Sequence, residues 1–85
     1  MDTRYAVYLH FDLLESLPKR DAQNRKVLNF IRSLAENPFT EGDFTDKDES
    51  SRPRHIKIVG DYAITYRVDH PAKSVIVIDL SQADN

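Results

Sequence analysis

The sequence predicts an α+β domain in which a helical hairpin packs on one face of a small antiparallel sheet. Two observations support this prediction. Helical periodicity is confined to residues 12–36, whereas residues 54–80 contain three extended segments separated by turn residues. The order of elements is therefore β-α-α-β-β-β. With 85 residues the chain has apolar material for one core, so residues 1–85 are expected to form a single domain.

The first half of the chain supplies one strand and two helical segments. Residues 5–11 are rich in aromatic and branched side chains, as is typical of a strand. A short apolar helical turn follows and is closed by Pro18. Residues 19–36 are expected to form the second helix, because apolar side chains recur at the spacing of one helical face. These side chains are Val27, Leu28, Ile31, Leu34 and Ala35.

Residues 38–53 are expected to form the only long irregular stretch. They contain Gly42, two prolines and a segment, residues 41–49, with five acidic side chains against one lysine. Phe39 and Phe44 are expected to anchor this stretch to the body of the domain. A loop of this length in a compact domain indicates function or mobility.

Three strands are predicted in the second half, over residues 54–59, 62–68 and 74–80. Gly60-Asp61 forms a tight turn between the first two strands, and a turn ending in Pro71 precedes the third. Side chains alternate between the two faces of a sheet, so the apolar members of each strand are assigned to the core. They are Ile56, Ile58, Tyr62, Ile64, Tyr66, Val68, Ile76, Ile78 and Leu80.

The helix-free face is expected to carry a cluster of polar side chains. His55, Lys57, Thr65 and Arg67 alternate with apolar residues on two strands that a two-residue turn joins, so their outer faces coincide. Cations at this spacing repel one another unless an anion compensates. Two interpretations stay open, a solvated sheet face of the ordinary kind and a ligand site.

Composition excludes several classes of protein. The absence of cysteine excludes a disulfide framework, a thiolate zinc site and thiol catalysis, and it fits a reducing compartment. The longest apolar run, residues 75–78, is far shorter than the ~20 residues of a membrane span, and the N-terminus does not resemble a signal peptide. The three histidines lack metal-ligand spacing. We therefore expect a cytoplasmic protein without membrane contact, bound metal or small-molecule cofactor.

The order and spacing of these segments resemble the RelE/ParE superfamily of small bacterial toxins from toxin–antitoxin pairs. The resemblance covers nearly the whole chain. It rests on the strand at 5–11, the helical hairpin, the helix end at 34–38 with Gly42 after it, and above all residues 54–68. It implies a curved antiparallel sheet backed by two helices, and a toxin held inactive by a cognate antitoxin protein. RelE-like members cut mRNA in the ribosomal A site without a metal, whereas ParE-like members inhibit DNA gyrase.

The function expected from this resemblance is action on translation by ribosome-dependent mRNA cleavage. Cleavage without a metal needs a base, an acid and cations that stabilise the phosphorane. We assign catalytic roles to His55 as base or acid, and to Lys57 and Arg67 as the cations. The residues expected to bind RNA phosphates are Arg52, Arg54 and Thr65.

Two alternatives stay open: a ParE-like gyrase inhibitor, and a catalytically inert member of the fold that binds a partner protein. The family usually has arginine after the tyrosine that opens the strand at 62–68, where this chain has Ala63. RelE-like nucleases also continue past the last strand with an arginine and a tyrosine, which residues 81–85 do not supply. Both departures favour the inert alternative.

Overall fold

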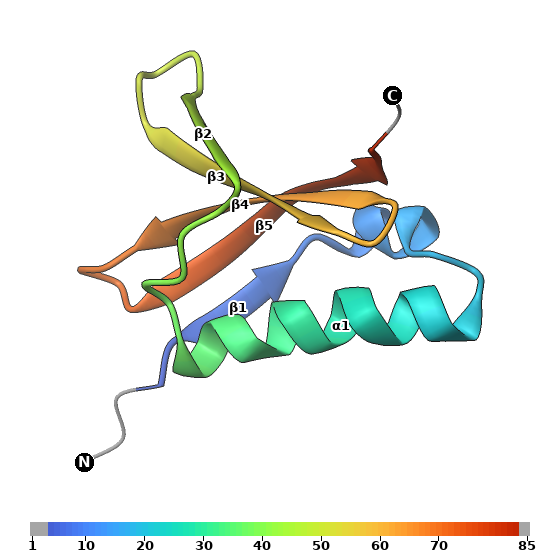
Figure 1. The fold of residues 1–85 in the computed structure, drawn as a ribbon. Helices are drawn as coiled ribbons and strands as arrows, with labels where there is room; N and C mark the ends of the chain where they lie inside the picture. The colour runs from blue at the N-terminus through green and yellow to red at the C-terminus, as the bar shows by residue number, and fades with distance from the viewer. Residues whose placement is uncertain (1–3, 84–85) are drawn as a thin grey trace.

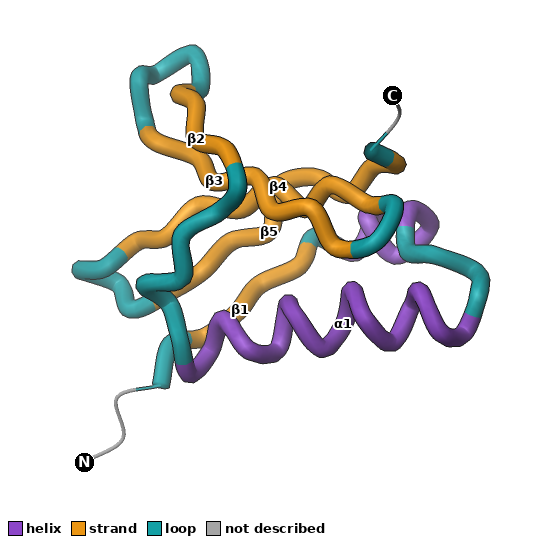
Figure 2. The backbone as a smooth tube through the Cα atoms, viewed as in Figure 1, coloured by secondary structure: helices purple, strands orange, loops and turns teal. Residues whose placement is uncertain are grey.

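Residues 4–83 are described in the computed structural model of this protein (Figures 1 and 2). In chain order the elements are β1 (Ala6–Leu9), the 3-10 helix η1 (Phe11–Ser16), α1 (Asp21–Glu36), β2 (Phe44–Lys47), β3 (Pro53–Val59), β4 (Tyr62–Asp69) and β5 (Ser74–Gln82). The expectations for the chain ends, at residues 1–3 and 84–85, lie outside the described residues. Neither helix of the described part is long and apolar enough to cross a membrane.

One five-stranded sheet forms the centre of the described molecule, in the order β1-β5-β4-β3-β2. β1 is parallel to β5, and all other neighbours are antiparallel. α1 runs along one face of the sheet, and the β2–β3 hairpin projects away from α1 (Figure 1). The α+β class with helical segments on one sheet face is therefore confirmed, with the first segment a 3-10 helix.

The core lies between α1 and the middle of the sheet. α1 contributes Val27, Ile31 and Leu34 to it, and all three side chains are buried. The sheet contributes Ile64, Tyr66, Val75, Val77 and Leu80. Leu13 and Leu17 pack against the same cluster, so η1 covers the same side of the sheet as α1. The apolar stripe of the predicted helix is thus confirmed as the core face of α1.

The stretch at 38–53 is not irregular throughout, because it contains β2, which pairs with β3. Gly42 lets the chain approach this closely: a Cβ there would lie 2.7 Å from the backbone oxygen of Ile56. The expectation that Phe44 anchors the segment was wrong, since this side chain is 60% exposed. Phe39 is 74% exposed, although its ring lies against the rings of two neighbours. Aspartates with low β propensity hid this strand in the sequence.

A β-bulge interrupts the pairing of β4 with β5. Thr65 pairs with Asp79, but the next residue, Tyr66, pairs with Val77. Ile78 is therefore an extra residue on β5. An extra residue shifts the alternation by one position. Odd-numbered residues of β5 therefore face the core before the bulge, and even-numbered residues face it after the bulge.

The bulge explains why the prediction for β5 was half wrong. Val75 and Val77, expected outside, are fully buried in the core. Ile76 and Ile78, expected inside, are only partly buried. Leu80 lies beyond the bulge and faces the core as expected.

This assignment predicts the relative cost of two substitutions in neighbouring residues of β5. Val77→Ala should lower the free energy of unfolding by about 2 kcal/mol, because it opens a cavity in the core. Ile76→Ala removes more atoms but should cost less, because its side chain keeps access to solvent. Urea unfolding measures both values. A larger loss for Ile76→Ala than for Val77→Ala would contradict the bulge.

Candidate functional site

The register between β3 and β4 decides which predicted site residues share a face of the sheet. His55 pairs with Tyr66, and Lys57 pairs with Ile64. Directly paired residues point to the same face, and both partners belong to the core under α1. His55 and Lys57 therefore lie on the helical side of the sheet. The prediction that they lie on the helix-free face was wrong.

The helix-free side of the sheet, called the open face below, carries isoleucines on β3. Ile56 pairs with Thr65, and Ile58 pairs with Ala63. Arg67 shares this face because it is two residues beyond Thr65 on β4. The predicted cluster is therefore divided: Thr65 and Arg67 lie on the open face as expected, but the two isoleucines expected in the core lie there with them.

The position of β3 explains why its apolar residues need not face the core. β3 is next to the edge of the sheet, and the chain between α1 and β2 runs across it to reach β2, with Phe39 and Glu41 beside His55 (Figure 1). The Tyr66 hydroxyl donates a hydrogen bond of 2.8 Å to the carbonyl oxygen of Thr40 in that segment. The inner side of β3 thus faces this connecting segment, which carries polar groups such as the Thr40 carbonyl and Glu41, and polar residues of β3 are tolerated there.

His55 lies on this covered side, beside a small cleft. Its ring is stacked on Tyr66, with ring centroids 5.3 Å apart and an interplanar angle of 23°. Its Nδ1 atom is buried and has no hydrogen-bond partner within the described residues. The cleft has a volume of about 280 Å³ and is also lined by Phe39, Glu41 and His70. Arg67 does not line it, so this imidazole and that guanidinium face different spaces.

Lys57 is paired with an acidic residue from the start of the β2 region. Its Nζ atom lies 3.5 Å from Oδ1 of Asp43. The other carboxylate oxygen of Asp43 accepts a 2.8 Å hydrogen bond from the backbone N–H of Ile58. That N–H and, to a smaller extent, the Lys57 ammonium lower the pKa of Asp43. Lys57 is thus held at the junction between β3 and the acidic segment.

Arg54 forms the best-defined ion pair of the described residues. Its Nε and Nη2 atoms donate to the two carboxylate oxygens of Asp46 at 2.9 and 2.8 Å. This is the bidentate arrangement that arginine forms with carboxylates and phosphates. The hydrogen bond to Asp46 raises the pKa of Arg54 further, so the side chain is a permanent cation.

Arg52 and Arg67 meet at a second aspartate of the same hairpin. Asp48 Oδ2 lies 3.0 Å from Arg52 Nε and 3.8 Å from Arg67 Nη1. Asp48 Oδ1 also accepts the backbone N–H groups of Ser50 and Arg52. The carboxylate therefore holds the hairpin turn and two cations at once, and its side chain is only 17% exposed.

Acid should weaken this arrangement. The backbone N–H of Arg52, above all, lowers the pKa of Asp48 below its ordinary value of 3.8. A carboxyl whose folded pKa is lowered contributes stability above its unfolded pKa and loses that contribution as the pH falls through its folded pKa. We expect urea unfolding between pH 6 and pH 2 to show a steeper acid loss of stability in the wild type than in Asp48→Asn. Equal slopes would contradict this role of Asp48.

The six predicted site residues thus fall into two groups. Arg52, Arg54 and Arg67 gather on Asp46 and Asp48 near the turn of the β2–β3 hairpin. Thr65 shares the open face, but it is only 9% exposed and offers little hydroxyl surface to a ligand. His55 and Lys57 form the second group, on the helical side.

Sequence reasoning missed the aspartates that hold the cations. The signal was present: the acidic stretch at 41–49 directly precedes a basic one, and opposite charges on neighbouring antiparallel strands pair. The aspartates and Gly42 of this stretch indicate a loop, so the sequence alone does not predict an acidic strand there.

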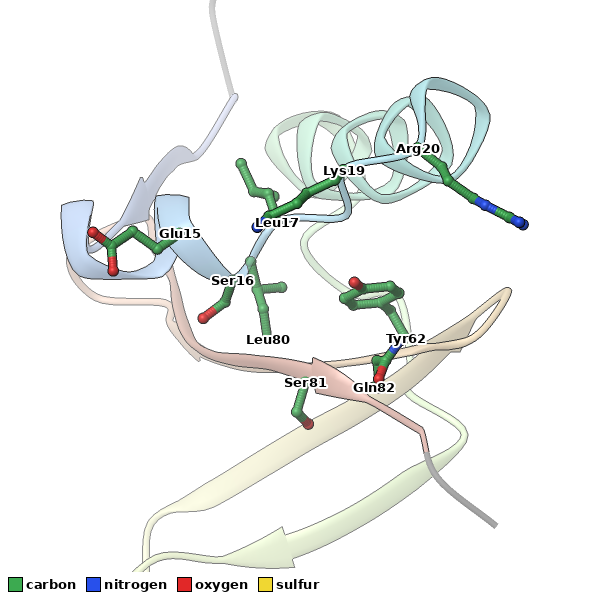
Figure 3. Close-up of a pocket in the computed structure, with 9 residues that line it drawn as sticks. All are labelled: Glu15, Ser16, Leu17, Lys19, Arg20, Tyr62, Leu80, Ser81 and Gln82. Carbon is green, nitrogen blue, oxygen red and sulfur yellow. The ribbon is translucent and has the colours of Figure 1, made fainter.

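Another cleft lies between the connection from η1 to α1, the start of β4 and the end of β5 (Figure 3). Its volume is about 480 Å³. Leu17, Tyr62 and Leu80 gather at its apolar side, whereas Arg20 points away (Figure 3). None of the predicted site residues lines it. No group of side chains suited to a metal ion occurs within residues 4–83.

Comparison with known proteins identifies the fold. A chain of the archaeal RelE–RelB complex from Pyrococcus horikoshii OT3 superposes with a TM-score of 0.74 at 24% sequence identity, over 96% of this chain and 98% of that one. A chain of the toxin–antitoxin complex RelBE2 from Mycobacterium tuberculosis gives a TM-score of 0.71 at 20% identity, over 93% and 98%. No family model and no curated protein matches the sequence. The chain therefore has the α+β fold of these RelE-type complexes, and that part of the resemblance is confirmed.

Proposed function

We propose that this chain is the toxin component of a toxin–antitoxin pair. The observation that supports the proposal is the structural match over nearly the full length of both chains, found twice, to chains from toxin–antitoxin complexes. Both matches span the sheet and the helices together, so the likeness extends beyond a common supersecondary motif. The partner of the chain is then an antitoxin protein.

The open face gives such a partner an apolar surface. Ile56, Ile58 and Ile76 are only partly buried there, and Tyr8, paired with Ile76, is 57% exposed. An uncovered apolar patch on a small domain is typical of an interaction site. A partner that binds the folded chain also stabilises it by mass action.

For the target we favour translation, with mRNA bound through its phosphates. The observation in favour is the gathering of Arg52, Arg54 and Arg67 at one corner of the open face. Arginine binds phosphate bidentately, as Arg54 already binds a carboxylate. His55 and Lys57 face the other side of the sheet, so one active site containing them and Arg67 does not form in this conformation.

Growth of a bacterial host after induced expression tests the proposed function. We expect growth arrest that is relieved when the small open reading frame adjacent to the gene is co-expressed, and a stable complex of the two products. Unimpaired growth together with a stable complex would instead support the inert partner-binding alternative. The absence of both growth arrest and a complex would contradict the proposal.

The target is tested with matched variants. Arg54→Ala/Arg67→Ala should reduce growth arrest and ribosome-dependent cuts in a reporter mRNA, whereas Arg25→Ala/Lys26→Ala should leave both unchanged. The second pair removes the same charge from exposed positions on α1. Trapped gyrase–DNA complexes without mRNA cuts would favour the ParE-like alternative and overturn the choice of mRNA.

A further inference from the structure

Three aspartates of the segment 43–48, called the acidic strap below, each face a cation of β3, β4 or the turn before β3. Asp43 pairs with Lys57, and Asp46 pairs with Arg54. Asp48 lies between Arg52 and Arg67. The strap is thus ion-paired with all the cations at 52–67 that are expected to bind phosphate, namely Arg52, Arg54, Lys57 and Arg67.

The carboxylates stand where an external anion would bind. Arg54 directs two N–H groups at Asp46, which is the geometry it would offer to a phosphate. The two other arginines converge on a single oxygen of Asp48. A phosphate group could replace either carboxylate only by removing it from the arginines.

The strap is attached weakly enough for such an exchange. β2 is a four-residue strand at the edge of the sheet, and all four of its side chains are exposed. It pairs with β3 alone, in a hairpin that projects away from α1 (Figure 1). The Arg54–Asp46 pair is partly exposed, with side chains 30% and 43% accessible, so salt screens it and it contributes little to stability. Displacing the strap would therefore leave the core under α1 intact.

We propose that the acidic strap is an internal anion that competes with RNA for Arg52, Arg54 and Arg67, so that the free chain binds single-stranded RNA weakly until these ion pairs open. This inference rests on the proposed function in choosing RNA as the ligand. It adds a regulatory role for Asp46 and Asp48 that RNA, or any factor that displaces β2, would have to overcome.

Charge removal at the strap tests the competition. Asp46→Asn/Asp48→Asn removes two charges, and the asparagine Oδ1 at position 48 still accepts the N–H groups of the turn. Binding is measured by fluorescence anisotropy with a labelled single-stranded RNA at several salt concentrations. We expect affinity roughly tenfold above the wild type and a salt slope steeper by about 2, since each cation released to a phosphate adds about 0.7.

The matched control is Glu41→Gln/Glu49→Gln, which removes the same charge from the same stretch. Neither glutamate has a salt bridge within residues 4–83. We expect its affinity to rise only slightly, with an unchanged slope. An equal gain in both double variants, or none in either, would overturn the proposal. Adding Arg54→Ala/Arg67→Ala should abolish the gain, and a gain that persists would also overturn it.

Two further readouts keep the outcome decisive. If the double variant fails to melt cooperatively in circular dichroism, Asp46→Asn alone replaces it, with an expected slope change of about 0.7. No change in that slope would overturn the competition. The growth assay is read separately: growth arrest without an RNA gain removes the strap role alone, and an RNA gain without growth arrest removes the proposed toxin function alone.

Discussion

Leu34→Ala is expected to lower the free energy of unfolding by about 3–4 kcal/mol. Leu34 is completely buried in α1, and it belongs to the cluster that joins the helix to β4 and β5. Truncation removes apolar contacts and leaves a cavity that a small domain fills poorly. Because domains of this size are marginally stable, the loss is a large part of the total.

The matched control for this prediction is Leu14→Ala in η1, where the side chain is 55% exposed. Its cost should stay below about 1 kcal/mol, because the leucine has little apolar contact to lose. Urea unfolding with circular dichroism gives both values. Similar costs for the two variants would mean that α1 does not pack on the sheet as described.

Tyr66→Ala is expected to cost about 4 kcal/mol, in the range for a buried aromatic residue. Tyr66 is fully buried, its ring lies against Phe30 and His55, and its hydroxyl donates to Thr40. It therefore joins the core, β3 and the segment before β2. Tyr66→Phe keeps the ring and should cost only about 1 kcal/mol, the value of one hydrogen bond.

Tyr66 should also make the stability of the protein depend on pH in the alkaline range. Burial raises the pKa of Tyr66 above its ordinary value of 10.0. A raised folded pKa means that the unfolded chain loses this proton first, so the stabilising contribution is full below the unfolded pKa and is lost as pH rises through the folded pKa. Stability should therefore fall less between pH 9 and pH 11 in Tyr66→Phe than in the wild type. An identical fall would contradict the burial of this hydroxyl.

Local pattern predicted those parts of the fold in which pattern and packing agree. The helical stripe from Val27 to Leu34 and the alternation of β4 through Ile64 and Tyr66 are both confirmed by burial. These elements lie in the middle of the molecule, where one side of each is covered and the other is open. In such elements the hydrophobic periodicity directly indicates which side is buried.

The remaining parts depended on tertiary features that no local pattern contains. The bulge at Ile78 reverses the alternation of β5, although the run of residues 75–78 is apolar at every position. On β3 the inner side faces the segment between α1 and β2, and Ile56 and Ile58 face outward. In such cases apolar character does not indicate the direction of the core.

The candidate site was divided by the same misassigned face. Once Ile56 is placed outward, His55 moves to the helical side and away from Arg67. What survives of the predicted site is its arginine group, joined by Asp46 and Asp48. These ion pairs connect the acidic and the basic stretches of the chain. An external anion that binds the arginines must therefore displace the carboxylates.

Nuclear Overhauser effects across β3 and β4 test the division of the two faces most directly. In labelled protein we expect the His55 ring to show contacts to the Tyr66 ring, and the Thr65 methyl group to show contacts to Ile56. Contacts between the His55 ring and the Arg67 side chain, with none to the Tyr66 ring, would contradict the account and restore a single basic cluster.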